Sequence, residues 1–280
     1  MKAKSWILAA RPKTLSAASA PVIVAAALAW RDRHAIEWIY ALCALFGALF
    51  IQIATNLIND ALDFKKGADT QERLGPLRVT QAGLLNPEHV LRGGYVCLFI
   101  AALFGIPLVA HVGWPLIIIG LASMLMAYAY TGGPYPLAYH GLGELFVMIF
   151  FGIVAVGGTY YVLTLQYAMD AFLCGIGIGS LAVVILAINN LRVLGGYRAS
   201  NKKTIATRIG ERGARIEIVV FVVLAFLAMR SLMVLIALPL AMALLVRVYR
   251  SSGRELNKCL AMAGALQWAF SLLFLIGALL

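Results

Sequence analysis

Three polar side chains interrupt an apolar stretch of the chain at helical spacing. Asn56, Asp60 and Asp63 are separated by four and three residues, so on a helix they share one face. Carboxylates within a membrane-type apolar segment are costly and usually face a cavity and a partner. Oxygen ligands one turn apart suit Mg²⁺, which takes one or two carboxylates and completes its shell with water and substrate phosphates. The spacing therefore predicts Asn56, Asp60 and Asp63 as ligands of Mg²⁺.

Basic residues follow this segment and recur later in the chain. Two loops carry them: Arg73 and Arg78 in the first, and Arg192, Arg198, Lys202 and Lys203 in or beside the second. Cationic side chains near a carboxylate–metal site suit an anionic, oxygen-rich ligand such as a diphosphate. The alternative interpretation is structural. The carboxylates would then lie at a frayed helix end in the cytoplasm and pair with neighbouring lysines. The basic loops would only mark the cytoplasmic side of a membrane protein, as they commonly do.

The elements that carry these residues are predicted to be membrane-spanning helices. Of 280 residues, 62% are hydrophobic and 12% are charged, whereas a soluble protein is closer to about half apolar and one quarter charged. We therefore expect an all-α, polytopic integral membrane protein that forms a single domain over residues 1–280. A spanning helix needs roughly 20 apolar residues, and nine segments are candidates: 15–30, 36–58, 93–112, 114–130, 144–163, 169–190, 216–229, 231–249 and 257–280.

The distribution of positive charge predicts how these helices are oriented. With a cytoplasmic N-terminus and nine alternating helices, 20 of the 23 Lys and Arg residues fall on the cytoplasmic side, as the positive-inside rule expects. The exceptions are Arg31, Arg33 and Arg230. The C-terminus is then outside the cell membrane. The net charge of +11 is explained by contact with anionic membrane lipid, so no nucleic-acid partner is expected.

Short motifs along the chain match those of a known family. The pattern N-D-x-x-D at residues 59–63 stands at the predicted cytoplasmic end of the second helix. Other matching stretches are Arg11-Pro12-Lys13-Thr14, Lys66-Gly67 with Asp69, Arg73 with Gly75-Pro76 and Arg78, Gln81 with Gly83, Tyr128-Ala129-Tyr130-Thr131, Gly141-Leu142-Gly143-Glu144, Asn189-Asn190-Leu191-Arg192, and Lys202 with Thr204. The chain thus resembles the UbiA superfamily of intramembrane prenyltransferases, and within it the menaquinone-branch 1,4-dihydroxy-2-naphthoate polyprenyltransferases.

The resemblance implies both a fold and an activity. The fold is a helical bundle around a cavity that opens toward the cytoplasm. The activity is transfer of a polyprenyl group from a polyprenyl diphosphate, held through Mg²⁺, to an aromatic acceptor; in this branch the acceptor is 1,4-dihydroxy-2-naphthoate, which loses its carboxylate. The catalytic residues that it implies are Asp60, Asp63, Arg198 and Lys202. The substrate-binding residues are Lys13, Asn56, Asn59, Asp69, Arg73, Arg78, Gln81, Tyr130, Asn189, Asn190 and Arg192.

The second aspartate-rich motif of the family is altered in this chain. Val193 and Tyr197 stand where the family has aspartates, and neither side chain is a good Mg²⁺ ligand. One interpretation is that the nearby basic residues neutralise the diphosphate directly. The alternatives are a degenerate, non-catalytic binder of polyprenyl diphosphate and a prenyltransferase for another aromatic acceptor. A transporter would carry its polar groups near mid-bilayer rather than at helix ends.

Two further side chains each allow two interpretations. Tyr130 either belongs to the aromatic belt of a membrane protein or offers the face of its ring to an allylic cation. Glu144 either suits the start of the helix at which it stands or positions the hydroxyl groups of the acceptor.

Overall fold

Every regular element of the computed structural model is a helix. The structure describes residues 2–67, 78–199 and 203–280, and no strand occurs within these ranges, which confirms the predicted all-α class. The elements are α1 (Lys2–Ala10), η1 (Pro12–Thr14), α2 (Ser16–Arg33), α3 (Trp38–Lys65), α4 (Pro87–Val112), α5 (Pro115–Ala129), η2 (Leu137–Tyr139), α6 (Gly143–Val147), η3 (Met148–Val154), α7 (Ala155–Thr164), α8 (Met169–Arg192), α9 (Leu194–Ala199), α10 (Ile205–Met229), η4 (Leu232–Ala237), α11 (Leu238–Arg250), η5 (Gly253–Glu255) and α12 (Leu256–Leu279).

Within the described ranges, six helical stretches are long and apolar enough to cross a membrane. They are α3, α4, the run from Gly143 to Thr164, α8, the run from Leu232 to Arg250 and the run from Gly253 to Leu279. A seventh would be the N-terminal pair Ala3–Thr14 and Ser16–Arg33, which is bent by 50°. The chain is therefore an integral membrane protein.

The predicted number of nine membrane-spanning helices is not confirmed by this criterion. The predicted segment 114–130 corresponds to α5, which has only 15 residues. The predicted segment 216–229 is the second half of α10, and the first half of this helix carries three arginines and Glu211. The breaks after the predicted segments 93–112 and 216–229 are found in the structure: α4 ends at Val112 and α10 ends at Met229, and the next residues, Gly113 and Arg230, have positive φ.

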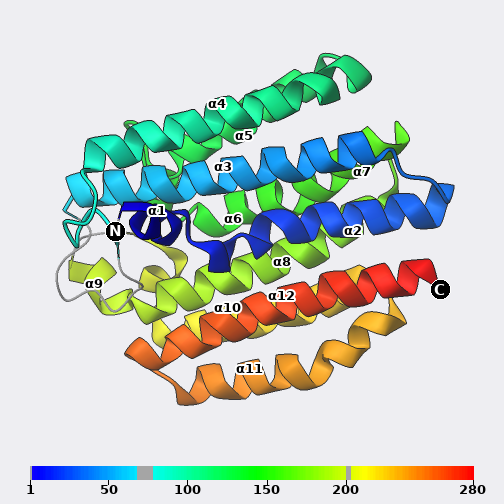
Figure 1. Cartoon of the computed structure of the whole chain (residues 1–280). Helices are drawn as coiled ribbons and strands as arrows, with labels where there is room; N and C mark the ends of the chain where they lie inside the picture. Colours follow the sequence, from blue (N-terminus) through cyan, green and yellow to red (C-terminus); the bar gives the residue numbers. More distant parts are fainter. Residues whose placement is uncertain (1, 68–77, 200–202) are drawn as a thin grey trace.

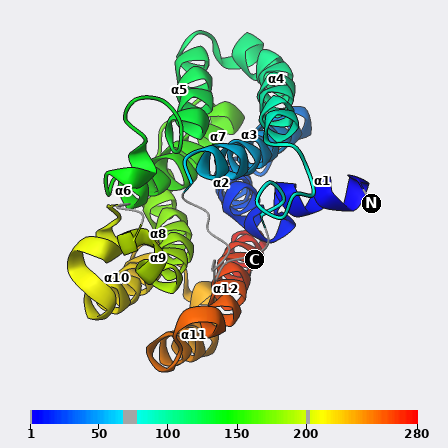
Figure 2. The same cartoon turned by 90° about the vertical axis from the view of Figure 1, so that its left-hand side faces the viewer.

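The long helices lie side by side, and the N- and C-termini are at opposite ends of the bundle (Figure 1). Viewed end-on, α4 and α5 lie on one side of the bundle and α10 and α11 on the opposite side (Figure 2). The α8 helix packs against α2, α7, α10 and α12. In its most apolar stretch 72% of the residues are buried, compared with 11% in the same stretch of α4. The α8 helix is therefore the central helix, and α4 faces the surroundings.

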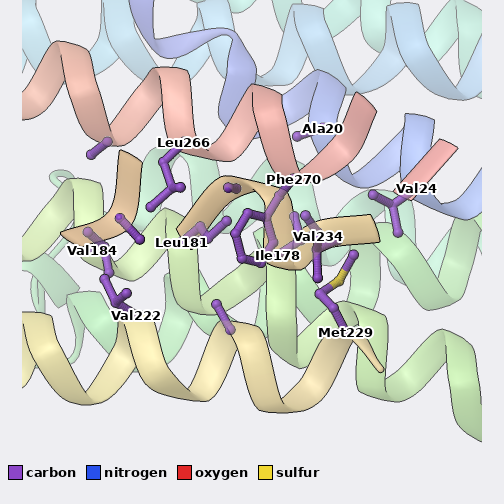
Figure 3. Close-up of a cluster of buried hydrophobic side chains, with 14 of the residues drawn as sticks. Ala20, Val24, Ile178, Leu181, Val184, Val222, Met229, Val234, Leu266 and Phe270 are labelled. Carbon is purple, nitrogen blue, oxygen red and sulfur yellow. The ribbon is translucent and has the colours of Figure 1, made fainter. Parts of the chain in front are cut away.

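The main apolar core forms around α8. Ile178 and Leu181 of α8 contact a cluster that includes Val24 of α2, Met229 of α10 and Phe270 of α12, and all five are almost completely buried. Figure 3 shows these side chains converging from the four helices. Because α8 ends in Asn189–Arg192, this core fixes the position of the polar residues at its C-terminal end.

Glycines bring α8 unusually close to the preceding helical run. A Cβ atom added at Gly152 would lie 2.4 Å from the carbonyl oxygen of Gly175 and 2.7 Å from Cα of Gly179. Gly152 belongs to η3, which is a π-helical turn between α6 and α7. Small residues permit such backbone contact between membrane helices. The contact holds the run that begins at Gly143 against α8.

Polar side chains connect the helices at the end of the bundle away from the N-terminus. Arg31 donates to Asp170 over 2.7 Å, and the Tyr160 hydroxyl donates to Asp32 over 2.8 Å. Arg33 donates to the carbonyl oxygen of Thr164 over 2.6 Å. Arg230 lies 3.9 Å from the Asp170 carboxylate, so all three basic residues that depart from the positive-inside pattern contact groups on neighbouring helices.

The close contact at Gly152 predicts a stability difference between two glycine substitutions in one helical run. Gly152→Ala should displace η3 from α8 and destabilise the protein by about 1–3 kcal/mol, as overpacking does. Gly157→Ala is the matched control, because no atom lies within 4 Å of a Cβ at that position. Thermal unfolding of the two detergent-solubilised variants provides the measurement. An equal melting temperature for both variants would contradict the packing described here.

Candidate functional site

At the N-terminal end of the bundle, the polar ends of several helices meet around one end of a large cavity. The cavity has a volume of about 1380 Å³. Its polar wall comes from the ends of α3 and α8 and the starts of α6 and α12. Its apolar wall comes mainly from α3, α4, α5, the η3–α7 run and α12. A cavity with one polar end and a long apolar remainder suits an amphiphile with an anionic head and a hydrocarbon tail.

A buried ion pair stands in the polar wall. Asp63 accepts a hydrogen bond from Nη2 of Arg78 through Oδ2, over 2.7 Å, and the two side chains are 6% and 5% exposed. The other carboxylate oxygen of Asp63 accepts a hydrogen bond from the Tyr139 hydroxyl over 2.8 Å. Burial and the nearby Asp63 carboxylate raise the pKa of the Tyr139 phenol well above its usual value, so Tyr139 remains a neutral donor.

Asp60 lies one turn deeper and is bonded to the start of the next described segment. Its carboxylate accepts hydrogen bonds from the backbone N–H of Val79, over 3.3 Å, from the N–H of Thr80, over 3.2 Å, and from the Thr80 hydroxyl. The side chain is only 1% exposed and is not among the residues that line the cavity. Asp60 therefore fixes the turn beside Arg78.

Asn56 and Asn59 extend the polar wall along α3. The Asn56 side chain donates to the carbonyl oxygen of Ala10 over 2.9 Å and to the Thr14 hydroxyl over 3.0 Å, which ties α3 to the N-terminal helices. Asn59 accepts a hydrogen bond from the Thr131 hydroxyl through Oδ1. Both asparagines line the cavity.

The end of α8 provides the opposite part of the polar wall. Arg192 is 2% exposed and donates to Asn189 over 2.6 Å and to Asn257 over 2.7 Å. Asn190 donates to Oε1 of Glu144 over 2.9 Å. Within the described part of the chain Arg192 has no carboxylate partner. A buried guanidinium with only neutral partners is costly, and a bound anion would compensate for it.

Nine of the predicted site residues come together at this cavity. They are Lys13, Asn56, Asn59, Asp63, Arg78, Tyr130, Asn189, Asn190 and Arg192. Asp60 and Gln81 do not line it. Asp69, Arg73 and Lys202 lie outside the described residues, and Arg198 is placed only by its backbone, in α9.

The donor set at this wall fits a single Mg²⁺ ion. Asp63 presents a carboxylate to the cavity. One or two carboxylates together with phosphate oxygens are enough for Mg²⁺. Among the described residues no cluster of three or more His, Cys, Asp or Glu side chains could hold a metal without such help.

Several cavity residues could not be identified as such from the sequence. Asn257 at the start of α12 lines the cavity, and so does Thr204 before α10, which the sequence marked only as part of a family motif. The only sequence signal at Asn257 is a polar residue at the beginning of an apolar segment, which is common in membrane proteins. Tyr197, one of the two residues that replace aspartates, also lines the cavity, whereas Val193 is buried and does not.

Three enzymes are similar to this chain over most of its length. The 1,4-dihydroxy-2-naphthoate octaprenyltransferase of Haemophilus influenzae is 32% identical, over 100% of this chain and 97% of the enzyme. The enzyme of the same name from Mycobacterium tuberculosis is 36% identical, over 95% and 94%. That from Escherichia coli is 37% identical, over 76% of this chain and 71% of the enzyme.

A solved structure and a family model agree with these relatives. The structure of a UbiA homologue from Archaeoglobus fulgidus bound to GPP and Mg²⁺ aligns with a TM-score of 0.70 at 13% identity, and covers 99% of this chain and 100% of that one. At this identity the likeness shows the fold alone. Residues 19–272 match the model of the UbiA prenyltransferase family. The resemblance seen in the sequence motifs is thereby confirmed, and the chain belongs to the UbiA prenyltransferase family.

Proposed function

We propose that this protein transfers a polyprenyl group from a polyprenyl diphosphate to 1,4-dihydroxy-2-naphthoate, with loss of the acceptor's carboxyl group, in menaquinone biosynthesis. The similar enzymes carry this acceptor in their names. The observation that carries the proposal is the cavity itself: one end is lined by buried arginine side chains and a carboxylate, and the rest is apolar. The apolar part suits the prenyl chain and the polar end suits the diphosphate.

Within this proposal, Arg78 and Arg192 hold the diphosphate from two sides of the cavity. Both guanidinium groups are buried, both line the cavity and they come from opposite walls. A guanidinium offers paired N–H donors that match phosphate oxygens, and such donors stabilise the charge that develops on a leaving diphosphate. Arg192 thereby replaces part of the charge that the missing aspartates and their metal would supply.

We propose that Mg²⁺ is held by Asp63, with Asp60 as the second carboxylate and Asn56 beside them. When bound, Mg²⁺ would neutralise charge on the diphosphate as its C–O bond breaks. Asp60 also holds Val79 and Thr80, and so positions the neighbouring Arg78. The Tyr139 hydroxyl donates a hydrogen bond to one oxygen of Asp63 and so holds that carboxylate in place.

We further propose that the whole chain, residues 1–280, is one domain that crosses the cell membrane nine times, with its N-terminus in the cytoplasm. Each predicted segment overlaps a helix or helical run, and the two termini lie at opposite ends of the bundle (Figure 1), as an odd number of crossings requires. The distribution of Lys and Arg supports the orientation.

A non-catalytic binder of polyprenyl diphosphate is the second candidate, because Val193 and Tyr197 replace aspartates. The two candidates differ in turnover. Val193→Asp with Tyr197→Asp should leave the rate of an active parent almost unchanged, because Arg192 already supplies positive charge there. A large gain in rate from this double variant would instead identify the chain as one that has lost a metal site.

Purified protein in lipid should join farnesyl diphosphate to 1,4-dihydroxy-2-naphthoate, and Arg192→Ala should weaken this activity selectively. Loss of a charged hydrogen bond costs roughly 1.5–3 kcal/mol, which corresponds to a rise of about tenfold to a hundredfold in the KM for the prenyl donor. Product formation by chromatography gives the measurement. Arg250→Ala, which removes an exposed charge, is the matched control. A parent that binds the donor without forming product would exclude the proposed activity.

Variants of Asp60, Asp63 and Thr80 should distinguish a role in metal binding from a role in positioning the loop. Asp63→Asn should lower Mg²⁺-dependent turnover by about a hundredfold or more, because a metal ligand worth several kcal/mol is lost. Asp60→Asn should have a similar effect, whereas Thr80→Val removes the main loop bond to Asp60 and keeps both carboxylates. Mg²⁺ titrations of turnover compare the three variants. If Thr80→Val is as damaging as Asp60→Asn, Asp60 acts only by holding the loop.

Reporter fusions test the proposed orientation. A fusion after Leu280 should behave as extracytoplasmic, because nine crossings place the C-terminus outside. A fusion after Arg254, between α11 and α12, is the control and should behave as cytoplasmic. Alkaline phosphatase and green fluorescent protein give opposite signals on the two sides. A cytoplasmic signal at Leu280 would show that the number of crossings is even.

A further inference from the structure

The carboxylate of Glu144 occupies an unusual position in the wall of the cavity. Glu144 is 4% exposed and lines the cavity at the start of α6. Within the described part of the chain it forms no ion pair with Lys or Arg, and its side-chain hydrogen bond comes from the neutral amide of Asn190, over 2.9 Å. A buried carboxylate without a cation has unused capacity as a hydrogen-bond acceptor.

A neutral phenol lies beside this carboxylate. A Cβ atom added at Gly143, the neighbour of Glu144, would be 3.2 Å from the hydroxyl oxygen of Tyr130, so this hydroxyl rests against the start of α6. Tyr130 lines the cavity, and its hydroxyl makes no hydrogen bond within the described ranges. Glu144, Asn190 and Tyr130 therefore form a compact polar patch, which we call the α6–α8 patch.

The α6–α8 patch is distinct from the groups proposed to bind the diphosphate. Those groups are cationic or would hold the metal, whereas the patch has one carboxylate and neutral donors. A negative charge repels a diphosphate or a carboxylate, and it favours a ligand that donates hydrogen bonds. Ring hydroxyl groups are such donors.

We propose, on the basis of the function proposed above, that Glu144 accepts a hydrogen bond from a ring hydroxyl of the aromatic acceptor and that Asn190 orients its carboxylate. Tyr130 lies beside the ring. An O–H group that donates to a carboxylate shares more electron density with its aromatic ring, and this makes the ring a better nucleophile toward an allylic cation. The same charge turns the acceptor's own carboxylate away from α6, toward the side of the cavity that Lys13 lines.

Glu144 itself neither gains nor loses a covalent bond in this proposal. The ring supplies the electron pair of the new C–C bond, and the allylic C–O bond breaks with its electron pair leaving on the diphosphate. Loss of CO₂ returns its bonding electron pair to the ring. The hydroxyl proton stays on the acceptor and is only shared with Glu144, so the reaction needs no other reactant.

The alternative is that Glu144 is purely structural. A carboxylate near the start of a helix interacts favourably with the helix dipole, and its bond to Asn190 joins α6 to α8. Such a role would give the same loss of activity with every acceptor. A hydroxyl-binding role depends on which hydroxyl groups the acceptor has.

The test combines Glu144→Gln with three acceptors and farnesyl diphosphate as the donor. The acceptors are 1,4-dihydroxy-2-naphthoate, 1-hydroxy-2-naphthoate and 4-hydroxy-2-naphthoate. With the dihydroxy acceptor, Glu144→Gln should lower kcat/KM by about tenfold to a hundredfold, the effect of losing a hydrogen bond to a charged group, and should leave the KM for farnesyl diphosphate unchanged. With the acceptor that lacks the bonded hydroxyl, parent and variant should be equal.

Two further variants control for folding and for general loss of charge. Glu217→Gln removes another partly buried carboxylate, which lies on α10 and does not line the cavity, and it should leave all three acceptors unaffected. Asn190→Leu keeps the Glu144 carboxylate but removes its orienting donor, and it should give a smaller loss with the same preference among acceptors.

The proposal is overturned if Glu144→Gln lowers kcat/KM equally for all three acceptors, if it changes the KM for the donor, or if Glu217→Gln has the same effect. Equilibrium binding of 1,4-dihydroxy-2-naphthoate without donor separates this proposal from the proposed function. A parent that binds the acceptor through Glu144 but forms no product would refute the activity alone. A variant that binds the acceptor as tightly as the parent would refute the role of Glu144.

Discussion

The ion pair between Asp63 and Arg78 is the interaction on which the polar end of this bundle depends. In an apolar interior, removing one partner of a buried pair costs roughly 3–5 kcal/mol, because the other charge remains without compensation. The pair joins the end of α3 to the segment that begins at residue 78, and Tyr139 adds the loop before α6. Three parts of the chain are thus held at one carboxylate, which faces the cavity.

The apolar core and the polar site share one helix. The α8 helix contacts α2, α10 and α12 through its buried side chains and approaches η3 through Gly175 and Gly179. At its end, the same helix presents Asn189, Asn190 and Arg192 to the cavity. The core therefore sets the distance between the two walls of the site, and small residues in α8 are as important to the site as its polar ones.

The sequence predicted the helical class, the membrane environment and most of the polar wall, because hydropathy and helical spacing are local properties. It placed Asn56 and Asp63 on one face, and both line the cavity. It could not predict that Asp60 bonds to Val79 and Thr80, because these residues lie 19 and 20 positions further along the chain, and a contact across such a separation is not encoded in a periodic pattern.

The contribution of the C-terminal helices to the site was also beyond local patterns. The arginines of α10 lower its hydropathy, so its membrane position depends on its neighbours. Asn257 reaches the cavity because α12 packs beside α2 and α8, and such packing between distant segments leaves no mark in the spacing of residues.

Biogenesis places different demands on α8 and α10. The most apolar stretch of α8 has a mean hydropathy of 2.6, so it can leave the translocon without help, although in the finished protein it contacts few lipids. By contrast, Arg215 of α10 bonds to the carbonyl oxygens of Val248 and Ser251, which the ribosome adds more than 30 residues later. The α10 helix therefore reaches its final position only after α11 has been synthesised, and the two helices mature as a pair.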